Sequence, residues 1–389
     1  MNEPVKVPWS GWEITKVLGS GSFGSVYEIQ RNVLGTITKA AMKVISVPRD
    51  TADLNDLISI GYDKESINAR FLDELKGISN EYNMMDQLKG NANIIYCEDL
   101  YYEEKPDGYG YDLYIRMELL EPLIKAIPNP ATEDQVIKLG IDMCNALSAC
   151  KKHKIIHRDI KPSNILISKD GNFKLGDFGV SKTSERTAGG TKTGTYGFMA
   201  PEVYNNKPYN ASVDIYSLGM VLYWMLNRRC GPFLPLPPTI PMAHQIDEAK
   251  QRRFNGEPIP APIDGSDELK AIVLKACAFD PDERYSSPEE LSAELEKLKY
   301  SSTVSNNDTI SSLRPQQSTS QYESSYDERT MGNNWGYTDE PTQGTQYGGE
   351  EIEQGGTVGR NYSEPKPVRE SKKKNRSTNV QQPAASKSP

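Results

Sequence analysis

The pattern of apolar residues changes from strand-like to helical along this chain. Strand-like composition marks residues 12–18, 25–30, 40–47 and 112–118, and apolar spacings of three and four mark a helix over residues 67–88. Beyond residue 130 the strong patterns are helical, and they cover residues 134–150, 213–227, 266–279 and 288–298. Strands first and helices later predict an α+β fold with two lobes of different class.

Apolar residues become too sparse near residue 300 to build a core. Residues 301–389 hold only 16 apolar residues in 89 and are rich in Ser, Thr, Gln, Asn and Gly. Such a stretch cannot bury enough surface to offset its chain entropy. We therefore expect a folded domain over residues 1–300, with lobes at about 1–118 and 119–300, and a disordered tail over 301–389. The basic end of this tail could touch acidic lipid or a partner, or be solvated.

Composition argues against several classes of protein. A net charge of −8 disfavours a sequence-independent nucleic-acid binder. Five scattered cysteines form no C-x-x-C pair and indicate a reducing compartment, and three histidines argue against a His-rich zinc site. The most apolar stretch, residues 213–226, is shorter than the roughly 20 residues of a membrane span. We expect a cytoplasmic protein with no nucleic acid and no membrane span.

Glycines gather at residues 19–24, which read Gly-Ser-Gly-Ser-Phe-Gly. Glycine lets backbone amides approach a phosphate without a side chain in the way. A strand pattern follows at residues 25–29, where a dinucleotide-binding motif would need a helix, so a strand–loop–strand flap is favoured. Phosphate binding and an ordinary glycine hairpin both stay open. Lys43, nineteen residues after the last glycine, could reach under the flap or point to solvent from an edge strand.

A dense polar run at residues 157–164 lies between apolar segments, and Asp177 stands thirteen residues beyond Asn164. Phosphoryl transfer needs a base that aligns the hydroxyl, hard oxygen ligands for magnesium, and cations for the phosphates. The chain supplies each of these in order. The run therefore indicates phosphoryl transfer.

This ordered set resembles the eukaryotic-like (Hanks-type) serine/threonine protein kinases, nearest to their bacterial branch, over about residues 10–298. The resemblance implies a bilobal protein kinase fold, with a β-rich N-terminal lobe and an α-helical C-terminal lobe. It also implies a serine/threonine protein kinase that uses ATP and Mg²⁺, with Mn²⁺ as an alternative. Lys161 and Pro162, after the catalytic aspartate, are typical of the serine/threonine class.

The resemblance assigns the catalytic roles. Asp159 would orient and deprotonate the substrate hydroxyl, and Lys161 would contact the γ-phosphate. Lys43 would hold the α- and β-phosphates. Its acidic partner is predicted at Glu81, with Glu74 two helical turns earlier as the fallback.

The resemblance also assigns the metal and nucleotide contacts. Asn164 and Asp177 would bind the metal. The implied nucleotide-binding residues, besides Lys43, are Leu18, Gly19, Ser20, Gly21, Ser22, Phe23, Gly24, Val26, Ala41, Met117, Glu118, Leu120 and Leu166. Met117 would be the gatekeeper, and Glu118 and Leu120 would offer backbone groups to adenine. Core packing is an equally good interpretation of the apolar members at 18, 26, 41 and 166.

The resemblance also implies an activation segment, which includes residues 181–193 and is closed by the Ala-Pro-Glu motif at residues 200–202. Regulation is expected there, since Arg158 precedes Asp159 and could pair with a phosphorylated residue of this segment. Lys174 could add a second cation. The alternative is a merely polar loop. The candidate sites of autophosphorylation are Thr191 first, then Thr187 and Thr193, and Thr195 is expected in the substrate-binding loop.

Further positions carry structural expectations. Glu202 and Arg284 resemble a buried ion pair, and Asp214 resembles the aspartate that braces the catalytic loop. The insertion at residues 46–65 could cap the first lobe, bind a partner or be passive. The proline-rich residues 231–238 could dock partners or pack along the second lobe.

Two other function classes stay open. A kinase-fold scaffold would bind nucleotide without turnover. A small-molecule kinase is disfavoured by the complete Ala-Pro-Glu motif at residues 200–202, because such enzymes usually lack this peptide-binding platform. Protein substrates are the expected partners, and autophosphorylation between copies would require self-association.

Overall fold

The computed structural model describes residues 5–21, 24–178 and 196–307. Several predicted features lie outside these ranges, so they stay predictions. They are Ser22, Phe23, Thr187, Thr191, Thr193, Thr195 and the tail after residue 307.

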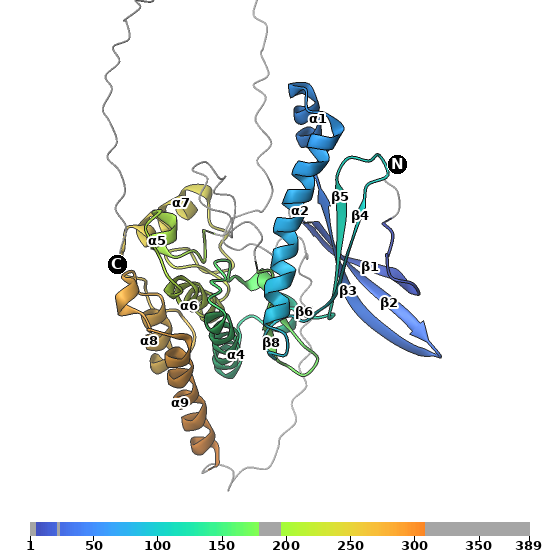
Figure 1. The fold of residues 1–389 in the computed structure, drawn as a ribbon. Coiled ribbons are helices and arrows are strands. Elements are labelled where there is room, and N and C mark those ends of the chain that lie inside the picture. Colours follow the sequence, from blue (N-terminus) through green and yellow to red (C-terminus); the bar gives the residue numbers. More distant parts are fainter. Residues whose placement is uncertain (1–4, 22–23, 179–195, 308–389) are drawn as a thin grey trace, which may run out of the picture. The chain divides into compact units, whose positions relative to one another are not determined.

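The first part of the chain forms one antiparallel sheet in the order β1-β2-β3-β5-β4 (Figure 1). The strands are β1 (Trp12–Gly21), β2 (Gly24–Val33), β3 (Thr36–Val47), β4 (Cys97–Glu104) and β5 (Tyr111–Met117). The four strands expected from sequence are confirmed, and β4 is additional. In β3, which lies between β2 and β5, residues 40–42 are buried.

Two helices follow β3. These are α1 (Thr51–Ile60) and α2 (Lys64–Gln87), so the helix expected over residues 67–88 begins three residues earlier. Asp50 caps α1 by accepting from two backbone amides, and Asp63 caps α2 by accepting from Ser66 N at 2.8 Å. Leu57 of α1 is buried in the main core. The insertion therefore packs onto the first lobe as a folded element.

The second part of the chain is mainly helical. Its helices are α3 (Leu123–Ala126), α4 (Glu133–Lys152), α5 (Pro201–Tyr204), α6 (Ser212–Leu226), α7 (Ala243–Phe254), α8 (Asp267–Ala276) and α9 (Pro288–Asn307). A small sheet pairs β6 (Glu121–Pro122), β7 (Ile165–Ile167) and β8 (Phe173–Leu175). The β-rich first lobe and helical second lobe are thus confirmed. The predicted domain end at residue 300 falls inside α9.

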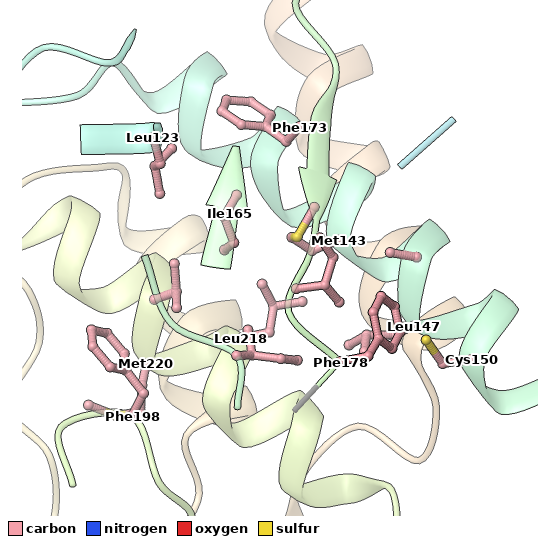
Figure 2. Packing of buried hydrophobic residues seen from close by; sticks show 14 of the residues in the cluster. Leu123, Met143, Leu147, Cys150, Ile165, Phe173, Phe178, Phe198, Leu218 and Met220 are labelled. Carbon is pink, nitrogen blue, oxygen red and sulfur yellow. The ribbon is translucent and has the colours of Figure 1, made fainter. Parts of the chain in front are cut away.

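The main core joins α4, α6 and the segment around β7 and β8. Figure 2 shows Met143 and Leu147 of α4, Leu218 of α6 and Phe178 in one packed cluster. Residues 213–226 of α6 are all buried, as expected for a core helix. Within the described ranges, the structure contains no helix with the length and apolarity that a membrane crossing requires.

The proline-rich residues 231–238 pack against the second lobe. Leu234 lies against the main core, and the Arg252 guanidinium lies 4.1 Å from the centre of the Phe233 ring. These contacts favour the packing interpretation of this segment over a projecting partner ligand.

Candidate active site

The loop after α4 is attached to α6 through one buried carboxylate. Asp214 is 3% exposed, and its two oxygens accept from the backbone amides of His157 and Arg158, each at 2.8 Å. Burial raises the pKa of Asp214, although these two hydrogen bonds favour its charged form. The expected brace of the catalytic loop is confirmed.

The His157 imidazole joins this loop to the segment after β8. The Asp159 amide can only donate, so its 3.3 Å contact makes His157 Nδ1 the acceptor. Nε2 then carries the proton and donates to Gly176 O at 3.1 Å. Burial lowers the pKa of His157, which agrees with this neutral form. The ring also meets Phe178 edge-on, with centroids 4.8 Å apart.

Two predicted catalytic residues, Asp159 and Lys161, lie together with the predicted metal ligand Asn164 in this loop. Asn164 Nδ2 donates to Asp159 O at 2.8 Å and to Asp159 Oδ2 at 3.1 Å. Lys161 Nζ lies 3.4 Å from the same Oδ2. The Asp159 carboxylate is therefore oriented by an amide and an ammonium, and its side chain keeps 15% exposure.

The predicted lysine of β3 meets the predicted metal ligand after β8. Lys43 Nζ lies 3.2 Å from Asp177 Oδ1, although 134 residues separate them. Gly176 N donates to Asn164 O at 2.9 Å, which ties the residue before Asp177 to the other predicted ligand. The predicted partner acid Glu81 lies on α2, as does Glu74. The pairing of Lys43 with Glu81 stays a prediction.

The glycine run forms the hairpin end of β1 and β2, where Gly19 pairs with Val26 and Gly21 with Gly24. The strand–loop–strand expectation is confirmed. At Gly24 φ is 110°, and a Cβ there would lie 2.1 Å from Val44 O, so only glycine fits. A Cβ at Gly19 or Gly21 would meet nothing within 4 Å. Packing does not require glycine at these two positions, whereas close approach of a phosphate would.

Strand β5 ends at the predicted gatekeeper, Met117. The residues that follow it, 118–120, are called the hinge. Met117 pairs with Ala41 across β3 and β5, and Ala41 is 5% exposed. Leu18 on β1 is 40% exposed, and Leu166 lies on β7. Val26 on β2 pairs with Lys43. These positions suit an apolar adenine site, and core packing stays an alternative for the buried members.

Glu118 directs its amide and its carboxylate into the protein. Its N–H donates to Tyr96 O at 3.1 Å, and its carboxylate accepts from Tyr96 N at 2.7 Å. Lys174 Nζ lies 2.7 Å from the same carboxylate. Lys174 therefore pairs with Glu118 of the hinge in this structure. Its expected role toward a phosphate of the activation segment stays a prediction, because residues 179–195 lie outside the described ranges.

The donor set fits a nucleotide with a divalent metal ion. Asn164 and Asp177 offer oxygen atoms, and Lys43 offers a cation beside them. In the described ranges, no three His, Cys, Asp or Glu side chains form a metal-binding group. Mg²⁺ commonly uses one or two protein carboxylates together with substrate phosphates and water, so two side-chain ligands suffice.

The expected ion pair of Glu202 and Arg284 is present and attaches the start of α5 to the second lobe. Arg284 Nη1 and Nη2 lie 2.7 Å and 2.9 Å from the two oxygens of Glu202, and both side chains are almost completely buried. This pair is confirmed. Sequence reasoning missed Arg253 of α7, which binds the backbone near this pair. The only sequence signal for this role was that Arg253 shares one helix face with the apolar residues of an otherwise polar segment.

Comparisons with known proteins agree with this arrangement. The family model described as protein kinase domain matches residues 12–295. A serine/threonine-protein kinase PknB of Mycolicibacterium smegmatis is 34% identical over 194 residues, which is 47% of this chain and 30% of that protein. A putative serine/threonine-protein kinase A of Trypanosoma brucei brucei is 35% identical over 156 residues, 39% of this chain and 34% of that protein.

A third relative covers more of the chain. A probable serine/threonine-protein kinase of Clostridium perfringens is 28% identical over 315 residues, 79% of this chain and 40% of that protein. The matches to these three relatives span 30–40% of the relatives' own length.

Proposed function

Because this chain belongs to the protein kinase domain family, we propose that it is a serine/threonine protein kinase. It transfers the γ-phosphate of ATP to serine or threonine hydroxyls of protein substrates. The observation that supports this most is the cluster of Lys43, Asp177, Asp159, Asn164 and Lys161, which three separate segments bring together.

The cluster supplies what the transfer needs. The substrate hydroxyl oxygen attacks the γ-phosphorus, and the bond to the β–γ bridging oxygen breaks, so ADP leaves with the electron pair. The hydroxyl proton goes to the Asp159 carboxylate, which Asn164 holds in orientation. Lys161, 3.4 Å from this carboxylate, offsets negative charge there and on the transferred group.

The nucleotide is held by the first lobe and the metal by the second. Lys43 binds the α- and β-phosphates, with Glu81 as its proposed partner, and Gly19, Gly21 and Gly24 leave room for them. Asn164 and Asp177 would hold magnesium, which when bound would supply positive charge to offset that of the nucleotide phosphates. Manganese could use the same oxygen ligands.

Two observations support proteins as the substrates: the buried ion pair at the end of the activation segment, and the names of the relatives. The buried pair Glu202–Arg284 fixes the end of the activation segment, which a small-molecule kinase would not need. The relatives are named as serine/threonine-protein kinases. Thr195 is the proposed contact of the substrate-binding loop, between Asp159 and Lys161.

Regulation and location complete the proposal. Autophosphorylation is proposed at Thr191, then Thr187 and Thr193, with self-association of two copies as its route. Arg158 is the proposed partner of the phosphate. A cytoplasmic location agrees with the five cysteines, which are all free thiols.

A transfer assay distinguishes the kinase from a nucleotide-binding scaffold. The purified chain is incubated with magnesium, γ-labelled ATP and myelin basic protein, and ATP binding is measured in parallel. Asp159→Asn should bind ATP and lose at least about a hundredfold in transfer rate, since the general base is gone. The control Asp170→Asn changes an exposed turn residue and should retain the rate. ATP binding without transfer in the unmodified chain would favour the scaffold.

A further inference from the structure

The last turn of α7 binds the backbone directly after the predicted substrate-binding threonine. Arg253 Nη1 donates to Met199 O at 2.8 Å and to Tyr216 OH at 3.0 Å, and Nη2 donates to Tyr196 O. Arg253 is only 4% exposed, so these partners replace the water that its charge has lost. A planar guanidinium suits this position because its fork reaches carbonyls at both ends of one turn.

The turn that Arg253 binds is fixed to the core on its other side. Phe198 is 7% exposed and meets the Trp224 ring of α6 edge-on, with centroids 6.4 Å apart. Two residues after Met199, α5 begins, and its Glu202 forms the buried pair described above. The backbone carbonyls of the turn are thus held by one side chain from α7.

Aromatic contacts join the same face of α7 to the same stretch of chain. Phe254 stacks on Tyr204 of α5 with centroids 3.8 Å apart, and Tyr204 meets Tyr196 edge-on at 5.8 Å. Lys250 Nζ lies 4.2 Å from the centre of the Tyr196 ring, within cation–π range. Spacings of three and four place Lys250, Arg253 and Phe254 on one face of the helix.

Helix α6 connects this arrangement to the catalytic loop. Asp214 binds the amides of His157 and Arg158, and Tyr216, two residues later, accepts from Arg253. The loop that carries Asp159 and the turn at residues 196–199 therefore share one rigid support.

We propose that Arg253 is a positioning residue that sets the backbone of residues 196–199 for binding of the protein substrate. The inference rests on the kinase function proposed above. Arg253 binds the turn and lies on a different lobe from Lys43 and the glycine hairpin. Loss of its fork weakens binding of the protein substrate and leaves the nucleotide site unchanged.

The test separates the two substrates kinetically. Arg253→Lys keeps the charge, but a single ammonium cannot bind both carbonyls in the fork geometry. We expect the KM for myelin basic protein to rise about tenfold, the loss of roughly one buried charged hydrogen bond. The KM for ATP and the ATP-induced rise in melting temperature should stay unchanged. The neighbouring Arg252→Lys, in an exposed pair with Glu257, is the matched control and should behave as the unmodified chain.

A second variant keeps the test decisive if Arg253→Lys fails to fold. Tyr216→Phe removes one partner of Arg253 and preserves the ring, and it should raise the same KM by a smaller factor. An unchanged KM for the protein substrate would overturn the inference, as would equal losses for both substrates, which indicate a general structural role. A complete lack of transfer by the unmodified chain would instead contradict the proposed kinase function.

Discussion

At the scale of single residues, the site depends on a buried imidazole that must stay neutral. His157 is 1% exposed, donates from Nε2 to Gly176 O and accepts at Nδ1 from the amide of Asp159. A proton on Nδ1 would face the Asp159 N–H and break this contact. The protonation state of His157 therefore affects the backbone of the proposed catalytic base.

This arrangement predicts a pH dependence of stability. Burial lowers the pKa of His157 below 6.5 in the folded state, so the unfolded chain binds more protons just below pH 6.5. Its contribution to stability is complete above pH 6.5 and is lost as the pH falls toward the folded pKa. The free energy of unfolding, measured by denaturant titration between about pH 7.5 and pH 5.5, should fall on acidification.

The control uses another histidine. His157→Gln should show a weaker loss of stability over this pH range, whereas His153→Gln, at an exposed position, should follow the unmodified chain. Equal slopes for His157→Gln and the unmodified chain would show that the imidazole does not titrate as described.

At the scale of elements, the first two turns of α2 clamp the β4–β5 hairpin. Asn68 Nδ2 donates to Gly108 O at 2.9 Å, and Gly110 N donates to Asn68 Oδ1 at 3.0 Å. Lys64 Nζ lies 4.9 Å from the centre of the Tyr109 ring. These contacts fix the start of the helix that carries Glu81.

Removal of this clamp should affect both stability and activity. Asn68→Ala loses two hydrogen bonds and leaves the hairpin groups without that partner, so we expect a loss of about 1–3 kcal/mol. The transfer rate should also fall, because α2 can then shift relative to Lys43. Denaturant unfolding and the transfer assay measure the two effects. Asn83→Ala, exposed on the same helix, should change neither; an equal effect there would contradict the clamp.

Two elements show where apolar periodicity fails as a guide. Strand β4 reads Cys-Glu-Asp-Leu-Tyr-Tyr-Glu-Glu, because an edge strand pairs on one side only and tolerates charge. Helix α7 buries Ile246, Ala249, Arg253 and Phe254. An arginine on the buried face breaks the apolar pattern, and its carbonyl partners come from a distant segment that sequence spacing does not reveal. By contrast, α4 and α6 have long apolar faces, and their positions were predictable.

At the scale of the whole molecule, the residues of the candidate site could be predicted from the sequence. The contacts that support these residues could be predicted only in part. Lys43, Asp159, Asn164 and Asp177 carry reactive groups in a recognisable order, and the structure brings them together. Arg253 acts through shape and backbone contacts, which leave no motif.

The pair of Glu202 and Arg284 joins segments 82 residues apart and predicts a large stability effect. Arg284→Met leaves the Glu202 carboxylate buried without its cation, so we expect a loss of about 3–5 kcal/mol in unfolding free energy. The double variant Glu202→Gln with Arg284→Met should recover part of this loss. Arg228→Met breaks a half-exposed pair with Asp264 and should cost less than about 1 kcal/mol. Similar losses for both arginines would contradict a special role for the buried pair.

The proposed kinase activity is tested most directly by the identity of the residue that carries label after transfer. The unmodified chain and Asp159→Asn are incubated with magnesium, γ-labelled ATP and myelin basic protein, and the product is hydrolysed in acid. We expect phosphoserine or phosphothreonine from the unmodified chain and a near absence of label from Asp159→Asn. Label confined to phosphotyrosine would contradict the serine/threonine class. Equal label from both proteins would contradict the role of Asp159 as the base.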